Sequence, residues 1–178
     1  MGAVAALIAA VALLVQSGLP QRAQFTGMIS SEGWIAPELN AIAPPFTRPT
    51  LDDNLFNLQN QSGSPIILNF WATWCVPCQV EMPILESLYD TYRDDGLKIV
   101  GINVGESHTL IQSWVSQYEL TFDIVPDPQE EITALYQVRG QPSTFIIAPD
   151  GTIIAIFFGP VSEQRLLSAL SPYLNQQG

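Results

Sequence analysis

The chain has 178 residues, of which 47% are hydrophobic, and it carries 17 Asp plus Glu against six Lys plus Arg. The formal net charge of -11 argues against a nucleic-acid-binding protein, because such a surface repels phosphate backbones. This length leaves room for one domain of ordinary size, with a hydrophobic core of its own, after an N-terminal segment of different composition.

The N-terminal segment is apolar. Residues 1–15 are all hydrophobic or glycine, and no charged side chain occurs before Arg22. As a helix, residues 1–19 would be roughly 28 Å long at ~1.5 Å per residue, close to the hydrocarbon thickness of a bilayer. We therefore expect a membrane anchor or uncleaved signal at residues 1–19, which holds the rest of the chain on the extracytoplasmic face of the cell membrane. The alternative is a signal peptide cleaved near residues 17–23, which would release a secreted protein.

The next segment, residues 20–43, mixes Gly, Pro, Ser and single aromatic residues without a sustained period. Such a composition is typical of a linker. We expect the folded domain to cover residues 44–178 and to open with a short extended piece near residues 46–51.

The first half of the domain predicts a strand followed by a helix. Residues 66–71 (IILNFW) form a short apolar run after a Gly-Ser-Pro turn, which is typical of a buried central strand. From about residue 80 to residue 92, large apolar residues recur every three or four positions, which predicts a helix that stops at the Asp-Asp-Gly of residues 94–96. Pro83 predicts a kink in that helix.

The second half of the domain continues the alternation of strands and helices. The expected elements are a strand at 97–104, a helix at 109–118, an extended run at 122–125, a helix at 129–136, two strands at 143–148 and 152–158, and a helix at 162–173. A Pro-Asp-Gly turn joins the last two strands, which predicts an antiparallel hairpin. Because strands that alternate with helices pair in parallel, we expect an α/β sandwich with a central mixed β-sheet flanked by helices, ending in that hairpin and a C-terminal helix.

The chemistry of the chain is expected at its only two cysteines, Cys75 and Cys78. Cys75 follows the buried strand at the N-terminus of the helix, where free backbone N–H groups and the helix dipole favour a thiolate nucleophile. Cys78 falls in the first helical turn, so it can resolve a mixed disulfide on Cys75, and Pro77 stiffens the loop between them. Two cysteines and one histidine, His108, are too few for a disulfide framework or a metal site, so we expect no metal and no cofactor beyond this redox-active pair.

The segment around the pair, residues 70–78 (FWATWCVPC), resembles the active-site segment of thioredoxin-like proteins. It is most similar to the TlpA/ResA branch, whose members are anchored in the membrane and face outside the cytoplasm. Three more segments resemble that branch in the same order, namely residues 43–46 (APPF), 103–107 (NVGES) and 141–145 (QPSTF). The resemblance covers about residues 44–175, and it implies a thioredoxin-like sandwich that works as a thiol-disulfide oxidoreductase.

The same resemblance implies roles for four further residues. Pro142 matches the cis-proline that lies opposite the cysteines, where the backbone before it can pair with a bound substrate segment. Trp74 would shield the thiol of Cys75, and packing as an ordinary core aromatic is the alternative. Glu81 and Glu106 match the two carboxylates that this branch places near its active site. Their alternatives are a solvated acid in the first helical turn and a cap or loop acid, respectively.

The reaction of such a pair needs a proton acceptor. Cys78 must lose a proton when it attacks the mixed disulfide. Thioredoxins proper have a buried Asp six residues before the first cysteine, and this chain has Asn69 there. Glu81 or Glu106 is therefore the candidate acceptor, since a buried Glu can exchange a proton near neutral pH. A negative charge close to the thiols would also oppose thiolate formation, which favours a slow and selective reductant.

These features predict a protein that reduces the disulfides of other proteins outside the cytoplasm. The resemblance implies apocytochrome c as the client, in cytochrome c maturation, and a membrane thiol carrier of the CcdA or DsbD kind as the electron source, because an oxidising compartment cannot regenerate a dithiol. A peroxidase of the peroxiredoxin type is one alternative, but Leu68 and Ala72 stand where that active site has Pro and Thr. A redox-inert binding module of the same fold is another, and the presence of both cysteines argues against it.

Overall fold

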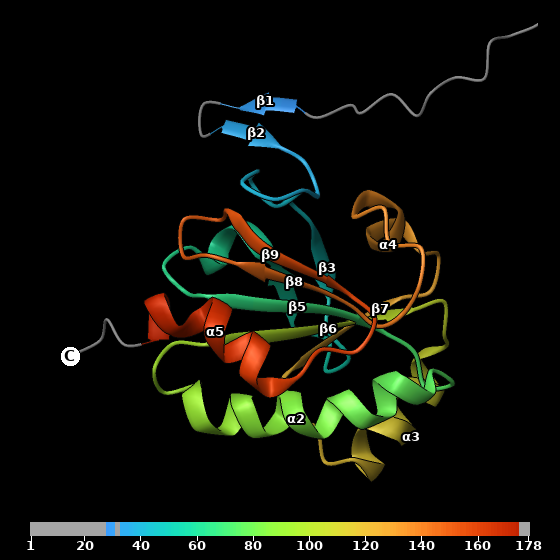
Figure 1. Cartoon of the computed structure of the whole chain (residues 1–178). Helices are drawn as coiled ribbons and strands as arrows, with labels where there is room; N and C mark the ends of the chain where they lie inside the picture. Colours follow the sequence, from blue (N-terminus) through green and yellow to red (C-terminus); the bar gives the residue numbers. More distant parts are fainter. Residues whose placement is uncertain (1–27, 31–32, 175–178) are drawn as a thin grey trace, which may run out of the picture.

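The computed structural model describes residues 28–30 and 33–174 (Figure 1). The anchor or signal expected at residues 1–19 lies outside this part of the chain. Within the described residues, no helix is both long enough and apolar enough to cross a membrane.

A five-stranded mixed sheet forms the centre of the domain, in the order β7-β6-β5-β8-β9. The middle strand, β5 (Ile66–Trp71), is buried at every residue, as its apolar sequence predicts. It pairs in parallel with β6 (Lys98–Val104), which pairs in parallel with β7 (Asp123–Asp127). On its other side β5 pairs antiparallel with β8 (Ser143–Ile147), and β8 forms a hairpin with β9 (Ile153–Phe158). The predicted mixed sheet with a closing antiparallel hairpin is confirmed.

Helices cover both faces of this sheet (Figure 1). One face carries α2 (Val76–Tyr92), α3 (His108–Gln117) and α5 (Glu163–Leu174), and the other carries the short α4 (Glu131–Leu135). The helix expected at 129–136 is this short because Glu130, directly before it, has a left-handed backbone conformation, with a φ of 57°. The long helix α2 begins directly after the turn that follows β5, so the sheet holds its N-terminus in place.

Alternate residues of β5 pack into two separate hydrophobic cores. Ile67 and Trp71 belong to the core under α2, whereas Leu68 and Phe70 belong to the core on the α4 side. Asn69 is the one polar residue of the strand, and alternation places it on the α2 side, where its side chain is 0% exposed. A buried amide thus lies between two large apolar side chains on the face that carries α2.

Two small antiparallel hairpins precede the sheet. They are formed by β1 (Met28–Ser30) with β2 (Gly33–Ile35), and by β3 (Thr47–Pro49) with β4 (Leu55–Asn57), which leads into the 3-10 turn η1 (Leu58–Gln61). The extended piece expected near residues 46–51 is therefore the first arm of a hairpin. The sequence does not reveal the second arm, because β4 has three residues and Phe56 is its only buried side chain.

The linker expected at residues 20–43 is wrong in its last part, because those residues pack on the domain. Asn40 N–H donates to Ile153 O at 2.9 Å, and Ile153 N–H donates to Ala41 O at 2.8 Å. The segment therefore lies along the outer edge of β9, the last strand of the sheet. An existing sheet edge can order a short segment that has no period of its own, and the composition of the segment does not show this.

Candidate active site

The two cysteines lie where the central strand passes into the first long helix. After β5 the chain makes a turn in which Cys75 N–H donates to Ala72 O at 3.2 Å, and α2 begins at Val76. Cys75 is the N-terminal cap of α2, and its Sγ accepts from the Cys78 N–H at 3.3 Å. Pro77 stands in the first turn, where a helix has no use for the N–H that proline lacks. The pair therefore lies at a helix N-terminus, as its place after the strand predicts.

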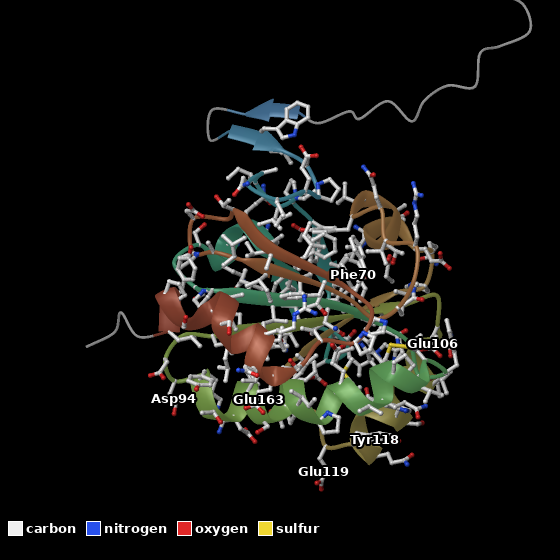
Figure 2. The ribbon with its side chains drawn as sticks, viewed as in Figure 1. Phe70, Asp94, Glu106, Tyr118, Glu119 and Glu163 are labelled. Carbon is white, nitrogen blue, oxygen red and sulfur yellow. A yellow bond between two sulfur atoms is a disulfide. The ribbon has the colours of Figure 1, made fainter. Side chains whose placement is uncertain are left out.

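Cys75 and Cys78 form a disulfide, with 2.02 Å between the Sγ atoms and 5.2 Å between the Cα atoms. Figure 2 shows this bond in yellow near the N-terminal end of α2, in the same part of the molecule as the labelled Glu106. Cys75 is 4% exposed and Cys78 is 0% exposed, so an incoming thiol or disulfide reaches Cys75 first. Within residues 28–30 and 33–174, no three His, Cys, Asp or Glu side chains form a group that could hold a metal ion.

Glu81 lies one helical turn after Cys78, and its side chain is 2% exposed, so it is not a solvated acid. Its Oε1 accepts from Val161 N–H at 3.0 Å, and its Oε2 accepts from Asn69 Nδ2 at 3.0 Å. Burial raises the pKa of Glu81 above its ordinary value of 4.5, and the two hydrogen bonds lower it by less. The site therefore contains a buried carboxyl, held by two donors, that takes up a proton more readily than a free glutamate.

Glu106 is 8% exposed, and its carboxylate accepts hydrogen bonds from the turn that precedes the cysteines. Its Oε1 accepts from Thr73 Oγ1 at 2.5 Å, and its Oε2 accepts from Thr73 N–H at 2.7 Å and from Asn103 Nδ2 at 2.7 Å. It does not cap α3, whose N-cap is Ser107. The carboxylate links the end of β6 to the turn between β5 and α2.

Pro142 follows a cis peptide bond, Gln141–Pro142, directly before β8. Because Ser143 pairs with Phe70 near the end of β5, Pro142 lies at the edge of the sheet from which β5 leads to the cysteines. The sheet thus brings Pro142 to the same end of the molecule as the disulfide, although it stands 64 positions after Cys78 in the sequence.

Exposed apolar side chains surround the start of α2. Trp74, directly before the pair, is 66% exposed, so it is not a core aromatic. Val76 and Val80 are each 68% exposed. Next to Pro142 a groove of about 640 Å³ opens, and Phe158, itself 75% exposed, lies in its wall. The exposed apolar side chains at the start of α2, beside the reactive pair, suit contact with another polypeptide.

Two buried asparagines complete the site, and their residue type and spacing alone predict no role for either of them. Asn69 of β5 donates to Glu81 and Asn103 of β6 donates to Glu106, and both side chains are 0% exposed. In each the Oδ1 atom has no hydrogen-bond partner among the described residues. The signal in the sequence is an asparagine within a run of otherwise apolar strand residues, 66–71 for Asn69 and 99–104 for Asn103.

Comparison with known sequences agrees with this geometry. The model of the AhpC/TSA family matches residues 39–156. The thiol-disulfide oxidoreductase ResA of Bacillus cereus (strain ATCC 10987 / NRS 248) is 32% identical over 160 residues, which are 90% of this chain and 91% of that protein. The ResA protein of Geobacillus kaustophilus is 34% identical over 137 residues, which are 75% of this chain and 79% of that protein.

Solved structures of similar fold include proteins named for thiol-disulfide chemistry. A putative thiol:disulfide interchange protein DsbE from Chlorobium tepidum aligns with a TM-score of 0.73 and 25% identity, over 78% of this chain and 99% of its own. StoA from Bacillus subtilis aligns with a TM-score of 0.63 and 28% identity, over 71% and 96%. A secreted Mycobacterium tuberculosis disulfide oxidoreductase aligns with a TM-score of 0.64 and 29% identity, over 71% and 95%. The chain therefore belongs to the AhpC/TSA family, and within it to the ResA-type thioredoxin-like thiol-disulfide oxidoreductases.

Proposed function

We propose that this thiol-disulfide oxidoreductase works as a reductant of client proteins outside the cytoplasm, with apocytochrome c as its client in cytochrome c maturation. The observation that carries the reductant role is the buried carboxyl of Glu81, three residues after Cys78 in α2. A negative charge there opposes the thiolate of the reduced pair, which makes the dithiol a less stable and more strongly reducing species. The similarity to ResA proteins supports the choice of client.

The reaction starts from the dithiol. The Cys75 thiolate attacks one sulfur of the client disulfide, forms a mixed disulfide with it, and releases the other client sulfur as a thiolate that takes a proton from water. Cys78 then loses its proton, attacks the Cys75 sulfur, and releases the second client sulfur. The client has gained two electrons, and the protein is left with the Cys75–Cys78 disulfide that the structure shows. A membrane thiol carrier of the CcdA or DsbD kind then returns two electrons to this disulfide.

Glu81 is the proposed acceptor of the Cys78 proton. The two residues stand three positions apart in α2, so their side chains share one face of the helix. The raised pKa of Glu81 makes its carboxylate a stronger base than a free glutamate, which favours transfer of the thiol proton to it as the thiol attacks. The same proton can afterwards pass to the client sulfur that leaves Cys75.

Glu106, the other candidate acceptor, we assign to holding the turn before the cysteines. All three of its contacts are with donors of Thr73 and Asn103, and Thr73 stands two residues before Cys75. These contacts fix the path of the backbone between β5 and α2. The position of Cys75 at the helix N-terminus depends on that path.

The client is proposed to dock on the apolar surface around the start of α2. Trp74, Pro77 and Pro142 would border the exposed edge of Cys75, with Trp74 shielding the thiol when no client is bound. The backbone before Pro142 would pair with the client segment that carries the disulfide. The exposed ring of Trp74 and the groove beside Pro142 support this proposal.

For the location, we propose that residues 1–19 anchor the protein on the extracytoplasmic face of the membrane and that residues 20–27 tether the domain to that anchor. The name of the secreted Mycobacterium tuberculosis relative supports a place outside the cytoplasm. Release after signal cleavage is the alternative outcome. Membrane fractionation of cells that express the full chain distinguishes the two, because a cleaved protein is found in the soluble extracytoplasmic fraction.

The decisive experiment is a trap with a Cys78→Ser variant of the full chain. This variant should hold clients on Cys75 as mixed disulfides, and mass spectrometry should identify apocytochrome c among them. The matched control is Cys75→Ser, which should trap nothing and should not reduce insulin. A reduction potential near the roughly -120 mV of DsbA would contradict the reductant role. Peroxide consumption as fast as disulfide reduction would favour a peroxidase, and insulin reduction that survives Cys75→Ser would leave only a binding module.

A further inference from the structure

Asn69 lies at the centre of a buried polar network that includes Glu81, the carboxyl three residues after Cys78. Its side chain is fully buried on β5, between Ile67 and Trp71 on the face covered by α2. Its Nδ2 donates to Glu81 Oε2 at 3.0 Å and to Thr144 Oγ1 at 2.9 Å. Thr144 is the residue of β8 that pairs with Asn69 across the sheet. The amide therefore connects two strands of the central sheet with the carboxyl of α2.

Within the part of the chain that the structure describes, the nitrogen of this amide is hydrogen-bonded, and its oxygen is not. Both N–H groups of Nδ2 have acceptors, whereas Oδ1 is buried and has no hydrogen-bond partner among the residues that the structure describes. A buried carbonyl without a partner is unfavourable, and a leucine would fill the same space without that penalty. What Asn69 adds to the site, compared with an apolar side chain, is its pair of donors.

We propose that Asn69 is a positioning residue of the thiol-disulfide reaction, whose amide fixes the Glu81 carboxylate and favours the ionised form that accepts the proton of Cys78. This inference rests on the proposed role of Glu81. Thr144 occupies one N–H group of the amide, so the other is directed at Glu81 Oε2. Val161 N–H holds the second carboxyl oxygen, Oε1, from the segment before α5. Removal of Asn69 would leave Oε2 without this donor in a buried site.

The balance of forces on Glu81 makes this donor important. Burial raises the pKa of Glu81, and the Val161 N–H and the Asn69 amide lower it; no charged side chain of the described residues contributes to the shift. The titratable groups nearest to Glu81 in sequence are Cys78 in its reduced form, three residues before it, and Glu86, five residues after it on α2. The acid that opens α5, Glu163, is exposed. Without the Asn69 donor, burial would raise the pKa of Glu81 further and increase the protonated fraction of its carboxyl, and a protonated carboxyl cannot accept the proton of Cys78.

The test measures the ionisation of Glu81 directly, in the purified full-length chain. Carbon-13 NMR of protein labelled at the glutamate carboxyl, with Glu81→Gln to assign the signal, gives the midpoint of the titration. In Asn69→Leu this midpoint should move up by about 1 to 2 pH units, which is the size expected when a hydrogen bond to a charged group is lost. The matched control is Asn103→Leu, which removes an equally buried amide that donates to Glu106 instead, and it should leave the Glu81 midpoint in place.

The kinetic readout is the rate at which the reduced protein reduces oxidised glutathione, measured against pH. In Asn69→Leu the acidic limb of this profile should move up with the Glu81 midpoint, so that the rate below the midpoint falls about tenfold for each pH unit by which the midpoint moves, and recovers at higher pH. On a Glu81→Gln background, Asn69→Leu should have no further effect on the profile. Thr144→Val, which removes the acceptor that orients the amide, should shift the midpoint in the same direction by less, and it serves if Asn69→Leu does not fold.

An unchanged Glu81 midpoint in folded Asn69→Leu protein would overturn the proposal. A shift of the pH profile that persists on the Glu81→Gln background would also overturn it, because the effect would then not pass through Glu81. The midpoint does not depend on any client. Its result is therefore separate from that of the Cys78→Ser trap, which tests the proposed function.

Discussion

The Glu81→Gln substitution should make the stability of the oxidised protein less sensitive to pH. Burial raises the pKa of Glu81 above the ordinary value of 4.5. Below that value the carboxyl is protonated in both the folded and the unfolded chain, so its ionisation does not affect folding. Above it the unfolded chain releases a proton that the folded chain keeps, and the free energy of unfolding falls until the pH passes the raised pKa. Gln cannot ionise, so this fall disappears in the variant.

The size of the effect follows from the shift itself, at about 1.4 kcal/mol for each pH unit by which the pKa is raised. Urea denaturation of the two proteins between about pH 4 and about pH 8 should show the variant gaining stability over the parent as pH rises, with the gain levelling off at the top. The amide of the variant must also fit between the Val161 and Asn69 donors, and this changes the free energy of unfolding by the same amount at every pH. Glu163→Gln, an exposed acid of α5, is the control and should follow the parent. Parallel stability curves for Glu81→Gln and the parent would refute the reasoning.

Three further substitutions test other contacts of the site and the core. Thr73→Val removes the hydroxyl that donates a hydrogen bond to Glu106 Oε1 at 2.5 Å, and it should lower the free energy of unfolding in urea by about 1 to 3 kcal/mol. An unchanged urea midpoint would contradict the role of Glu106 in holding the turn. Phe70→Ala should lower it by about 3 to 5 kcal/mol, because Phe70 is fully buried with its ring centroid 5.4 Å from that of Tyr136. A loss below about 1 kcal/mol would argue against that packing. Trp74→Ala should leave stability within about 0.5 kcal/mol, because the ring is 66% exposed, and should slow insulin reduction more than glutathione reduction. Equal slowing of the two would argue against contact between Trp74 and a protein client.

Most of the fold could be predicted because its signals are local. The apolar run of β5, the spacing of large residues along α2 and the Pro-Asp-Gly turn between β8 and β9 each lie within a few consecutive residues. The segment that covers the edge of β9 could not be predicted in this way. Its order comes from hydrogen bonds between Asn40 or Ala41 and Ile153, more than a hundred residues away.

In the active site, too, the local features could be predicted from the sequence and the contacts between distant residues could not. The cysteines could be placed at a helix N-terminus because they directly follow a strand and open a helix. The environment of Glu81 could not be inferred from spacing, because its partners lie 12 residues before it, at Asn69, and 80 residues after it, at Val161. Whether a first-turn acid is solvated or buried depends on how the segment before α5 packs against α2. The exposure of Trp74 likewise depends on the path of the turn, and an aromatic residue beside a core strand has no sequence signal that separates the two outcomes.

The segment around Asn40 and Ala41 has a consequence for the behaviour of the protein in concentrated solution. β9 is the outermost strand of the sheet, and the free backbone groups of an outermost strand can pair with a strand of another molecule. Here both backbone groups of Ile153 are already occupied by Asn40 and Ala41. The residues that lead into the domain thus close off the beginning of this edge and make it a poor template for self-association.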